Sequence, residues 1–127
     1  MSTLSPELQH HIQAFADALL ATEQSDDFVK ARTTFEGDET AIDLMTRLNT
    51  LSYELSRKQH AGTLEQHEIA QYKEVQEEFI SNEVVAELEQ RERMLVELMR
   101  ECNHEISGML GLDFAKDAAQ SSCGCSS

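Results

Sequence analysis

The sequence contains no tryptophan, one proline and five glycines, and aromatic residues make up only 6% of its 127 residues. Turn-rich β folds need more glycine and proline than this, and a core without tryptophan must be built from Leu, Ile, Val, Met and Ala, which suits helices packed on helices. A chain of this length is long enough for one core and too short for two ordinary domains. We therefore expect one all-α domain.

Basic residues are also scarce, since 10 Lys and Arg oppose 24 Asp and Glu and leave a formal net charge of -14. Such a surface repels phosphates, so we expect no direct binding to nucleic acid. No apolar run approaches the roughly 18 residues that span a bilayer, and the first residues have neither the basic start nor the apolar core of a signal peptide. We expect no membrane partner and a cytoplasmic location.

Apolar residues recur every three or four positions along most of the chain, which predicts a series of helices. The expected helix starts are Ser5 with Pro6, Ser25 to Asp27, Asp38, and a capping box of Thr63 with Gln66, and the expected ends are Gly37, Gly62 and Ser81-Asn82. The predicted fold is an all-α helical bundle of four to five helices with a long C-terminal helix. It occupies residues 1–114 and is followed by a flexible, cysteine-containing tail over residues 115–127.

The long helix, from residue 82 to about residue 110, gives the clearest pattern. About 28 residues make a helix of about 40 Å, longer than a compact monomer of this size can cover. We therefore expect a homodimer or higher oligomer, with an interface on one apolar stripe: Val85, Leu88, Leu95, Leu98, Met99 and Ile106. The alternative is that the two preceding helices bury the stripe completely.

Three cysteines are too few for a secreted disulfide framework, and two of them, Cys123 and Cys125, lie in the tail. They are candidate ligands for a soft metal or an iron-sulfur cluster. Four thiolates are usual for a four-iron cluster or a closed zinc site, so a second chain or a partner would have to supply the others. The alternatives are free or redox-reactive thiols, or a metal-delivery role with zinc or copper. Cys102 falls on the apolar stripe, where we expect it to pack as a small hydrophobe.

Two Glu-x-x-His sequences, Glu7 with His10 and Glu101 with His104, have the spacing that ferritin-like proteins use to hold two irons. A chain rich in glutamate is expected to produce such pairs by chance, so a solvated surface is the favoured interpretation and a di-iron protein the alternative. No nucleophile elbow, phosphate-binding glycine loop or His-Glu-x-x-His motif is present in the sequence. We expect a protein that is not an enzyme.

Several segments resemble the YlbF/YmcA family of control-of-competence and cell-fate regulators, with a match over residues 12–114. The resemblance is clearest in Ile80-Ser-Asn-Glu-Val-Val-Ala-Glu-Leu88 and in Asn103 to Phe114, and it extends to Asp27-Phe-Val-Lys-Ala31 and Phe35-Glu36-Gly37-Asp38. Beyond this match, the tail Ser122-Cys-Gly-Cys-Ser126 is similar to the cysteine-bearing tails of YlbF proteins.

The resemblance implies an all-α oligomer without known catalysis that binds other YlbF/YmcA-type subunits. It also implies a role in competence, sporulation, biofilm formation and RNA maturation, and association with a four-iron four-sulfur cluster. This sequence departs from the richer tail pattern because it offers only Cys123 and Cys125. A cluster would then be shared between subunits or with a partner.

Overall fold

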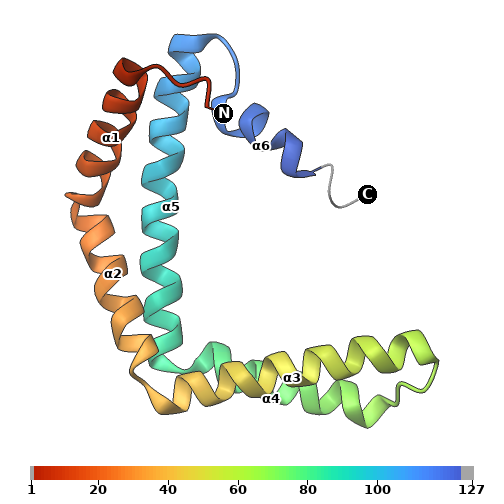
Figure 1. Ribbon diagram of the computed structural model, residues 1–127. Helices are drawn as coiled ribbons and strands as arrows, with labels where there is room; N and C mark the ends of the chain where they lie inside the picture. The colour runs from red at the N-terminus through yellow and green to blue at the C-terminus, as the bar shows by residue number, and fades with distance from the viewer. Residues whose placement is uncertain (1, 124–127) are drawn as a thin grey trace. The chain divides into compact units, whose positions relative to one another are not determined.

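The computed structural model describes residues 2–123, and these residues form six α-helices and no strand. The helices are α1 (Pro6–Leu20), α2 (Glu23–Glu36), α3 (Glu39–Ala61), α4 (Gln66–Ser81), α5 (Glu83–Leu110) and α6 (Phe114–Cys123) (Figure 1). The predicted all-α class is confirmed. The chain divides into two compact units, Met1–Arg91 (unit 1) and a second that begins at Glu92 (unit 2), so the boundary lies within α5.

Helix α1 begins as predicted, because the Ser5 hydroxyl accepts a hydrogen bond from the amide of Leu8 at 3.1 Å and Pro6 occupies the first turn. The predicted start of α2 is wrong. The cap is Thr22, whose hydroxyl accepts from the amide of Ser25 at 3.1 Å. Ser25 is 4% exposed and lies inside the first turn of the helix. Helix α2 therefore follows α1 after a break of only two residues (Figure 1).

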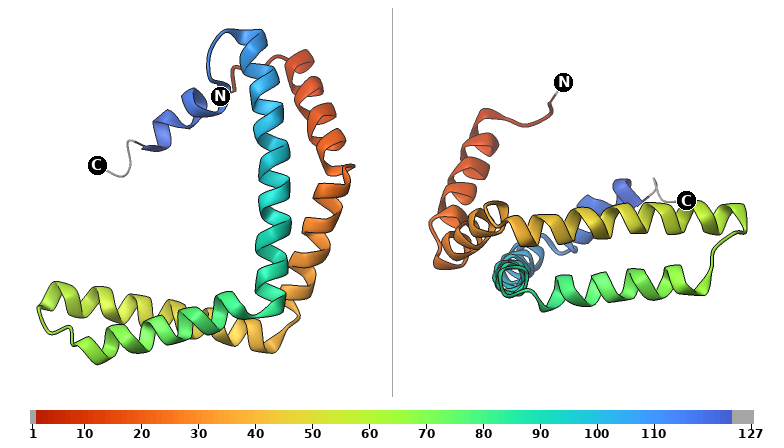
Figure 2. Two further views of the ribbon diagram at one scale, coloured as in Figure 1. Left: turned by 180° about the vertical axis from the view of Figure 1, so that it is seen from behind. Right: turned by 90° about the horizontal axis from the view of Figure 1, so that it is seen from below.

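Helices α3 and α4 form an antiparallel hairpin in which the two helices lie side by side (Figures 1 and 2). Asp38 caps α3 as predicted and accepts from the amide of Ala41 at 2.8 Å. Gly62 ends it at φ 74°, a left-handed conformation that favours glycine. The predicted capping box of Thr63 with Gln66 is wrong, since α4 is capped at Glu65, whose amide donates to the Glu68 carboxylate at 3.0 Å.

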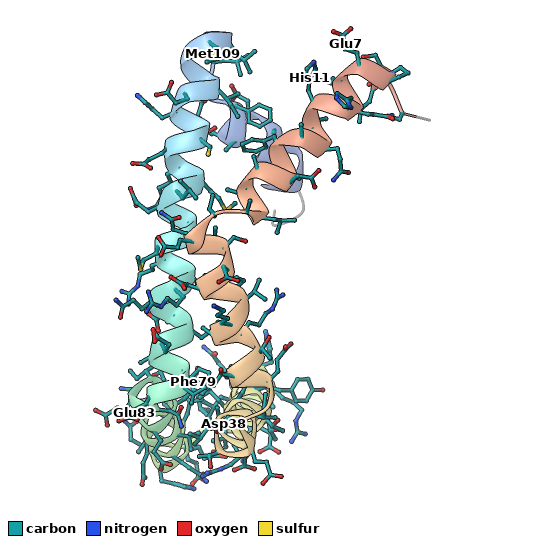
Figure 3. All side chains as sticks on the ribbon, turned by 90° about the vertical axis from the view of Figure 1, so that its left-hand side faces the viewer. Glu7, His11, Asp38, Phe79, Glu83 and Met109 are labelled. Atoms are coloured by element: carbon teal, nitrogen blue, oxygen red, sulfur yellow. The ribbon has the colours of Figure 1, made fainter. Side chains whose placement is uncertain are left out.

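The core of unit 1 lies where α2, α3 and α5 meet, near the end of the hairpin. Phe35, Ala41 and Val85 are 9%, 0% and 6% exposed, respectively, and form its centre. Partly buried side chains surround them: Ile42, Met45, Phe79, Val84 and Leu88. Figure 3 shows this region beside the labelled residues Asp38, Phe79 and Glu83.

The break between α4 and α5 occurs where the sequence predicted it. Asn82 ends α4, and its side-chain oxygen accepts from the amides of Val84 and Val85 at 2.9 and 3.1 Å, which caps the start of α5. The same residue therefore closes one helix and opens the next. Helix α5 has 28 residues, as predicted.

Unit 2 contains the remainder of α5, a turn at Gly111, and α6. The tail was predicted to be flexible from residue 115 onward, but the chain forms a helix through Cys123, and Asp113 caps it by accepting from the amide of Lys116 at 3.2 Å. The predicted division into a domain over 1–114 and a tail does not coincide with the boundary of the compact units. Among the helices of residues 2–123, none combines the length and apolar character needed to cross a membrane.

Candidate functional site

Two of the six predicted interface residues lie in the core of unit 1. Val85 is 6% exposed and belongs to the central cluster, and Leu88 packs against that cluster. Their side chains contact other parts of the same chain, so the prediction that Val85 forms an exposed interface is wrong. The apolar side chains in the first two turns of α5 therefore pack within unit 1, against α2 as well as against the two preceding helices named in the alternative.

The other four predicted interface residues lie on the part of α5 that belongs to unit 2. Leu95, Leu98 and Ile106 are half-buried, and Met99 is 49% exposed. Sequence reasoning missed Met94, which is 43% exposed on the same segment. Figure 3 shows Met109, which is 82% exposed, at the far end of α5. This part of α5 therefore carries apolar side chains that remain accessible.

Charged side chains on α5 pair at helical spacing. Arg91 donates to the Glu87 carboxylate at 3.0 Å and lies 3.7 Å from the Asp27 carboxylate of α2. Arg100 lies 3.1 Å from the Glu97 carboxylate. The contact with Asp27 joins α5 to α2 within unit 1, so Arg91 contributes to the fold.

The shifted pKa values belong to groups outside α5. A hydrogen bond to the Glu68 carboxylate raises the pKa of Lys58, and the same hydrogen bond, aided by the amide of Glu65, lowers the pKa of Glu68. This ion pair joins the last turn of α3 to the first turn of α4. On α2, a hydrogen bond from the exposed Lys30 to Asp26 raises the pKa of Lys30. The largest cause of each shift is a hydrogen bond within an ion pair on α2 or between α3 and α4.

The three cysteines are placed very differently. Cys102 is a half-buried free thiol on α5. Cys123 is the last residue of α6, and Cys125 lies outside the described residues. The whole chain has three cysteines, whereas a four-iron cluster usually needs four thiolates. One chain alone therefore does not fit such a cluster.

The two Glu-x-x-His pairs lie on exposed surfaces of different units. Glu7 and His10 are exposed on α1, and Glu101 and His104 are exposed on α5. Across residues 2–123, no group of three His, Cys, Asp or Glu side chains is arranged to hold a metal ion. The described residues therefore give the di-iron alternative no support.

Three polar residues near the end of α5 escaped the sequence analysis: Asn103, Ser107 and Asp113. Their side chains form hydrogen bonds with one another and with the start of α6. The available signal was Asp113 just before Phe114-Ala-Lys116, a pattern that fits a helix cap. We did not identify this helix start in the sequence because residues 115–127 were expected to form a flexible tail.

The fold is that of a known helical protein. The chain is similar to Bacillus subtilis RicA, which was crystallised in complex with RicF, with a TM-score of 0.77 and 20% sequence identity over 85% of this chain and 96% of that one. At this level of identity the likeness establishes the fold alone. Among curated proteins, none matches the sequence.

The sequence itself matches a family model. The model described as control of competence regulator ComK, YlbF/YmcA aligns with residues 8–110, which cover α1 almost completely and α2 to α5 in full. This span agrees with the resemblance seen in the sequence over residues 12–114. The chain therefore belongs to the YlbF/YmcA family of competence regulators.

Proposed function

We propose that this protein is a non-enzymatic regulatory adaptor that binds other helical protein chains, including a second copy of itself. The family match over residues 8–110 carries this proposal, because it places the chain among regulators of competence. The similarity to RicA, which was crystallised with RicF, supports a role in protein complexes. Sporulation, biofilm formation and RNA maturation are the processes in which we expect it to act.

The proposed binding surface is the accessible apolar side of α5 in unit 2. Leu95, Leu98 and Ile106 are half-buried, and Met99 is about half exposed at 49%. An α-helix that shows apolar side chains at spacings of three and four residues packs well against another helix. Methionine adapts to partners of different shape because its side chain is long and unbranched.

Sedimentation velocity of the full-length protein tests self-association, and affinity purification from its own cells followed by mass spectrometry tests partner binding. We expect a Met99→Gln variant to weaken both, with a dissociation constant raised about tenfold, which corresponds to roughly 1.4 kcal/mol. The matched control is Glu101→Gln, which changes an exposed residue two positions away on the opposite side of the helix. A monomer that recovers no family member would contradict the proposal.

We also propose that Cys123 and Cys125 contribute ligands to a metal or iron-sulfur cluster that another chain completes. Support comes from the Cys-Gly-Cys spacing and from the family resemblance of the tail. Anaerobic purification with a visible spectrum and elemental analysis tests it. We expect bound metal to be lost in a Cys123→Ser, Cys125→Ser double variant and kept in a Cys102→Ser control. A metal-free wild-type protein would rule out this second proposal and leave the adaptor role untouched.

A further inference from the structure

The first turn of α6 is held by three side chains, two of which belong to α5. The amide of Phe114 donates to Ser107 Oγ at 2.8 Å, and the amide of Ala115 donates to Asn103 Oδ1 at 2.8 Å. The amide of Lys116 donates to Asp113 Oδ1 at 3.2 Å. The first amides of a helix have no acceptor within the helix. In α6, the first three amides all donate to side-chain oxygens that lie outside the helix.

The same three side chains also bind one another. The Ser107 hydroxyl donates to Asn103 Oδ1 at 3.2 Å, and Asn103 Nδ2 donates to Asp113 Oδ1 at 3.4 Å. Asn103 therefore uses both ends of its amide, with the oxygen accepting from Ser107 and the backbone while the nitrogen reaches Asp113. We call Asn103, Ser107 and Asp113 the polar clasp. Because its members share hydrogen bonds, the loss of one weakens the contacts of the others.

Apolar burial contributes little to the position of α6. Phe114 is 45% exposed, and Leu112 in the preceding turn is 51% exposed. Every α6 side chain that the structure describes, from Phe114 to Ala119, is exposed. Gly111, at φ 78°, provides the left-handed turn that reverses the chain. Hydrogen bonds within reach of water add little stability each, because water replaces them when they open.

We propose that the polar clasp is a conformational switch. When closed, it fixes the first turn of α6 to the end of α5 and so sets the direction of the chain that leads to Cys123. When open, it releases α6 while α5 stays helical, because the backbone of Asn103 and Ser107 belongs to the hydrogen-bonded ladder of α5. Elements held by few apolar contacts and by exposed hydrogen bonds open locally without global unfolding. The switch requires no bound metal, so it stands apart from the proposal for the cysteines.

Amide hydrogen exchange of the full-length protein, followed by NMR, tests the switch. In a Ser107→Ala variant we expect the amides of Phe114, Ala115 and Lys116 to exchange together, each about three- to tenfold faster than in the wild type. Acceleration at Lys116 is decisive, because its own acceptor, Asp113, is unchanged. An Asn103→Ala variant should give the same pattern, whereas Ser107→Thr, which keeps the hydroxyl, should stay near the wild type.

The control is His104→Ala, which alters an exposed neighbour of Asn103 and should leave all three amides unchanged. Faster exchange at Phe114 alone in Ser107→Ala, and at Ala115 alone in Asn103→Ala, would overturn the proposal, because the three side chains would then act separately. Equal acceleration of the α5 amides around Leu98 would also overturn it, since α5 would be unfolding with α6.

Discussion

Single polar side chains determine where the helices of unit 1 begin. Thr22, Asp38 and Asn82 each accept a hydrogen bond from a backbone amide of the helix that follows. These amides have no partner within the helix, so each cap removes an unsatisfied donor and fixes the direction of the chain. Asp38 lies three residues before the fully buried Ala41, whose amide it binds, and so joins a helix start to the core.

Replacing Asp38 with alanine removes the cap of α3. We expect the free energy of unfolding to fall by about 1 kcal/mol, the usual cost of losing an N-cap side chain. Urea denaturation followed by circular dichroism measures the change. Asp38→Asn is the matched variant, because it keeps an oxygen acceptor, and it should stay close to the wild type. An equal loss in both variants would show that charge, not capping, is responsible.

Replacing Val85 with alanine tests whether the core of unit 1 lies where α2, α3 and α5 meet. Its side chain is 6% exposed and contacts the cluster of Phe35 and Ala41, so Val85→Ala removes buried methyl groups and leaves a cavity. We expect a loss of roughly 2 kcal/mol in the free energy of unfolding, measured by thermal or urea denaturation. The control is Val29→Ala on α2, where the side chain is 39% exposed and the expected loss is much smaller. Equal effects would contradict the placement of the core.

The N-cap residues also show how far the start of a helix can be predicted from the sequence. Ser5 was found because Pro6 follows it, and Asp38 because it lies between Gly37, which ends one helix, and the apolar pattern of the next. At the start of α2, Thr22 and Ser25 are both good capping residues, and the structure shows that Thr22 is the cap and that Ser25 is buried in the first turn. Two capping residues so close together leave the local pattern ambiguous.

At the scale of the element, the hairpin of α3 and α4 has its ion pair at the tip. Lys58 and Glu68 join the last turn of one helix to the first turn of the next, beside the loop that starts at Gly62. Glu68 also accepts from the amide of Glu65, so one carboxylate both caps α4 and closes the hairpin. The tip is therefore sensitive to the charge of this group.

The stability contributed by the Lys58–Glu68 pair should depend on pH. The pKa of Glu68 is lowered from its ordinary 4.5, so its contribution is complete above that value and is lost as the pH falls through the lowered pKa. The pKa of Lys58 is raised from 10.5, so its contribution is complete below 10.5 and is lost as the pH rises through the raised pKa. The pair is fully effective between the two ordinary values.

Glu68→Gln tests this dependence, because glutamine can keep the capping hydrogen bond while losing the charge. We expect the variant to be less stable than the wild type at neutral pH. The difference should shrink as the pH falls below the ordinary pKa of Glu68. Urea denaturation of both proteins at about pH 7, 5 and 3 measures it. A difference that stays constant over this range would show that the charge of Glu68 does not stabilise the hairpin.

The sequence predicted a helix correctly where apolar residues repeat over many turns, and it missed a short helix without such a repeat. Helix α5, with 28 residues and an apolar stripe, was predicted at its full length. Helix α6, with 10 residues, was missed because its small and polar side chains are all exposed as far as Ala119 and form no apolar stripe. The amides of Phe114 and Ala115 at its start donate hydrogen bonds to the side chains of Ser107 and Asn103, which a helical pattern does not reveal.

At the scale of the whole molecule, the formal net charge of -14 opposes the self-association that we propose. Two copies that approach each other carry charges of the same sign, and dissolved salt screens that repulsion over about 10 Å at 0.1 M. The charge follows directly from the composition. The interface stays a prediction for Leu95, Leu98, Met99 and Ile106, whereas Val85 and Leu88 lie in or against the core of unit 1.

Self-association should therefore strengthen as salt is added. We expect the dimer dissociation constant to fall when sodium chloride is raised from about 0.05 to 0.5 M, because screening reduces the repulsion and apolar contacts persist. Sedimentation equilibrium at several salt concentrations measures it, with Met99→Gln as the variant that should remain mostly monomeric throughout. A dissociation constant that rises with salt would show that attraction between opposite charges, such as Arg100 with a carboxylate of the second copy, holds the dimer.

Helices that follow one another in the sequence pack together, and this has a consequence for folding during translation. In unit 1 the most extensive helix contacts join α1 with α2, α2 with α3, and α3 with α4. Contacts between residues close in sequence form quickly, because little chain entropy is lost in closing short loops. The hairpin of α3 and α4 can therefore assemble on the ribosome as soon as Ser81 has left the exit tunnel. Completion of the core waits for Val85 and Leu88, which are translated only a few residues later.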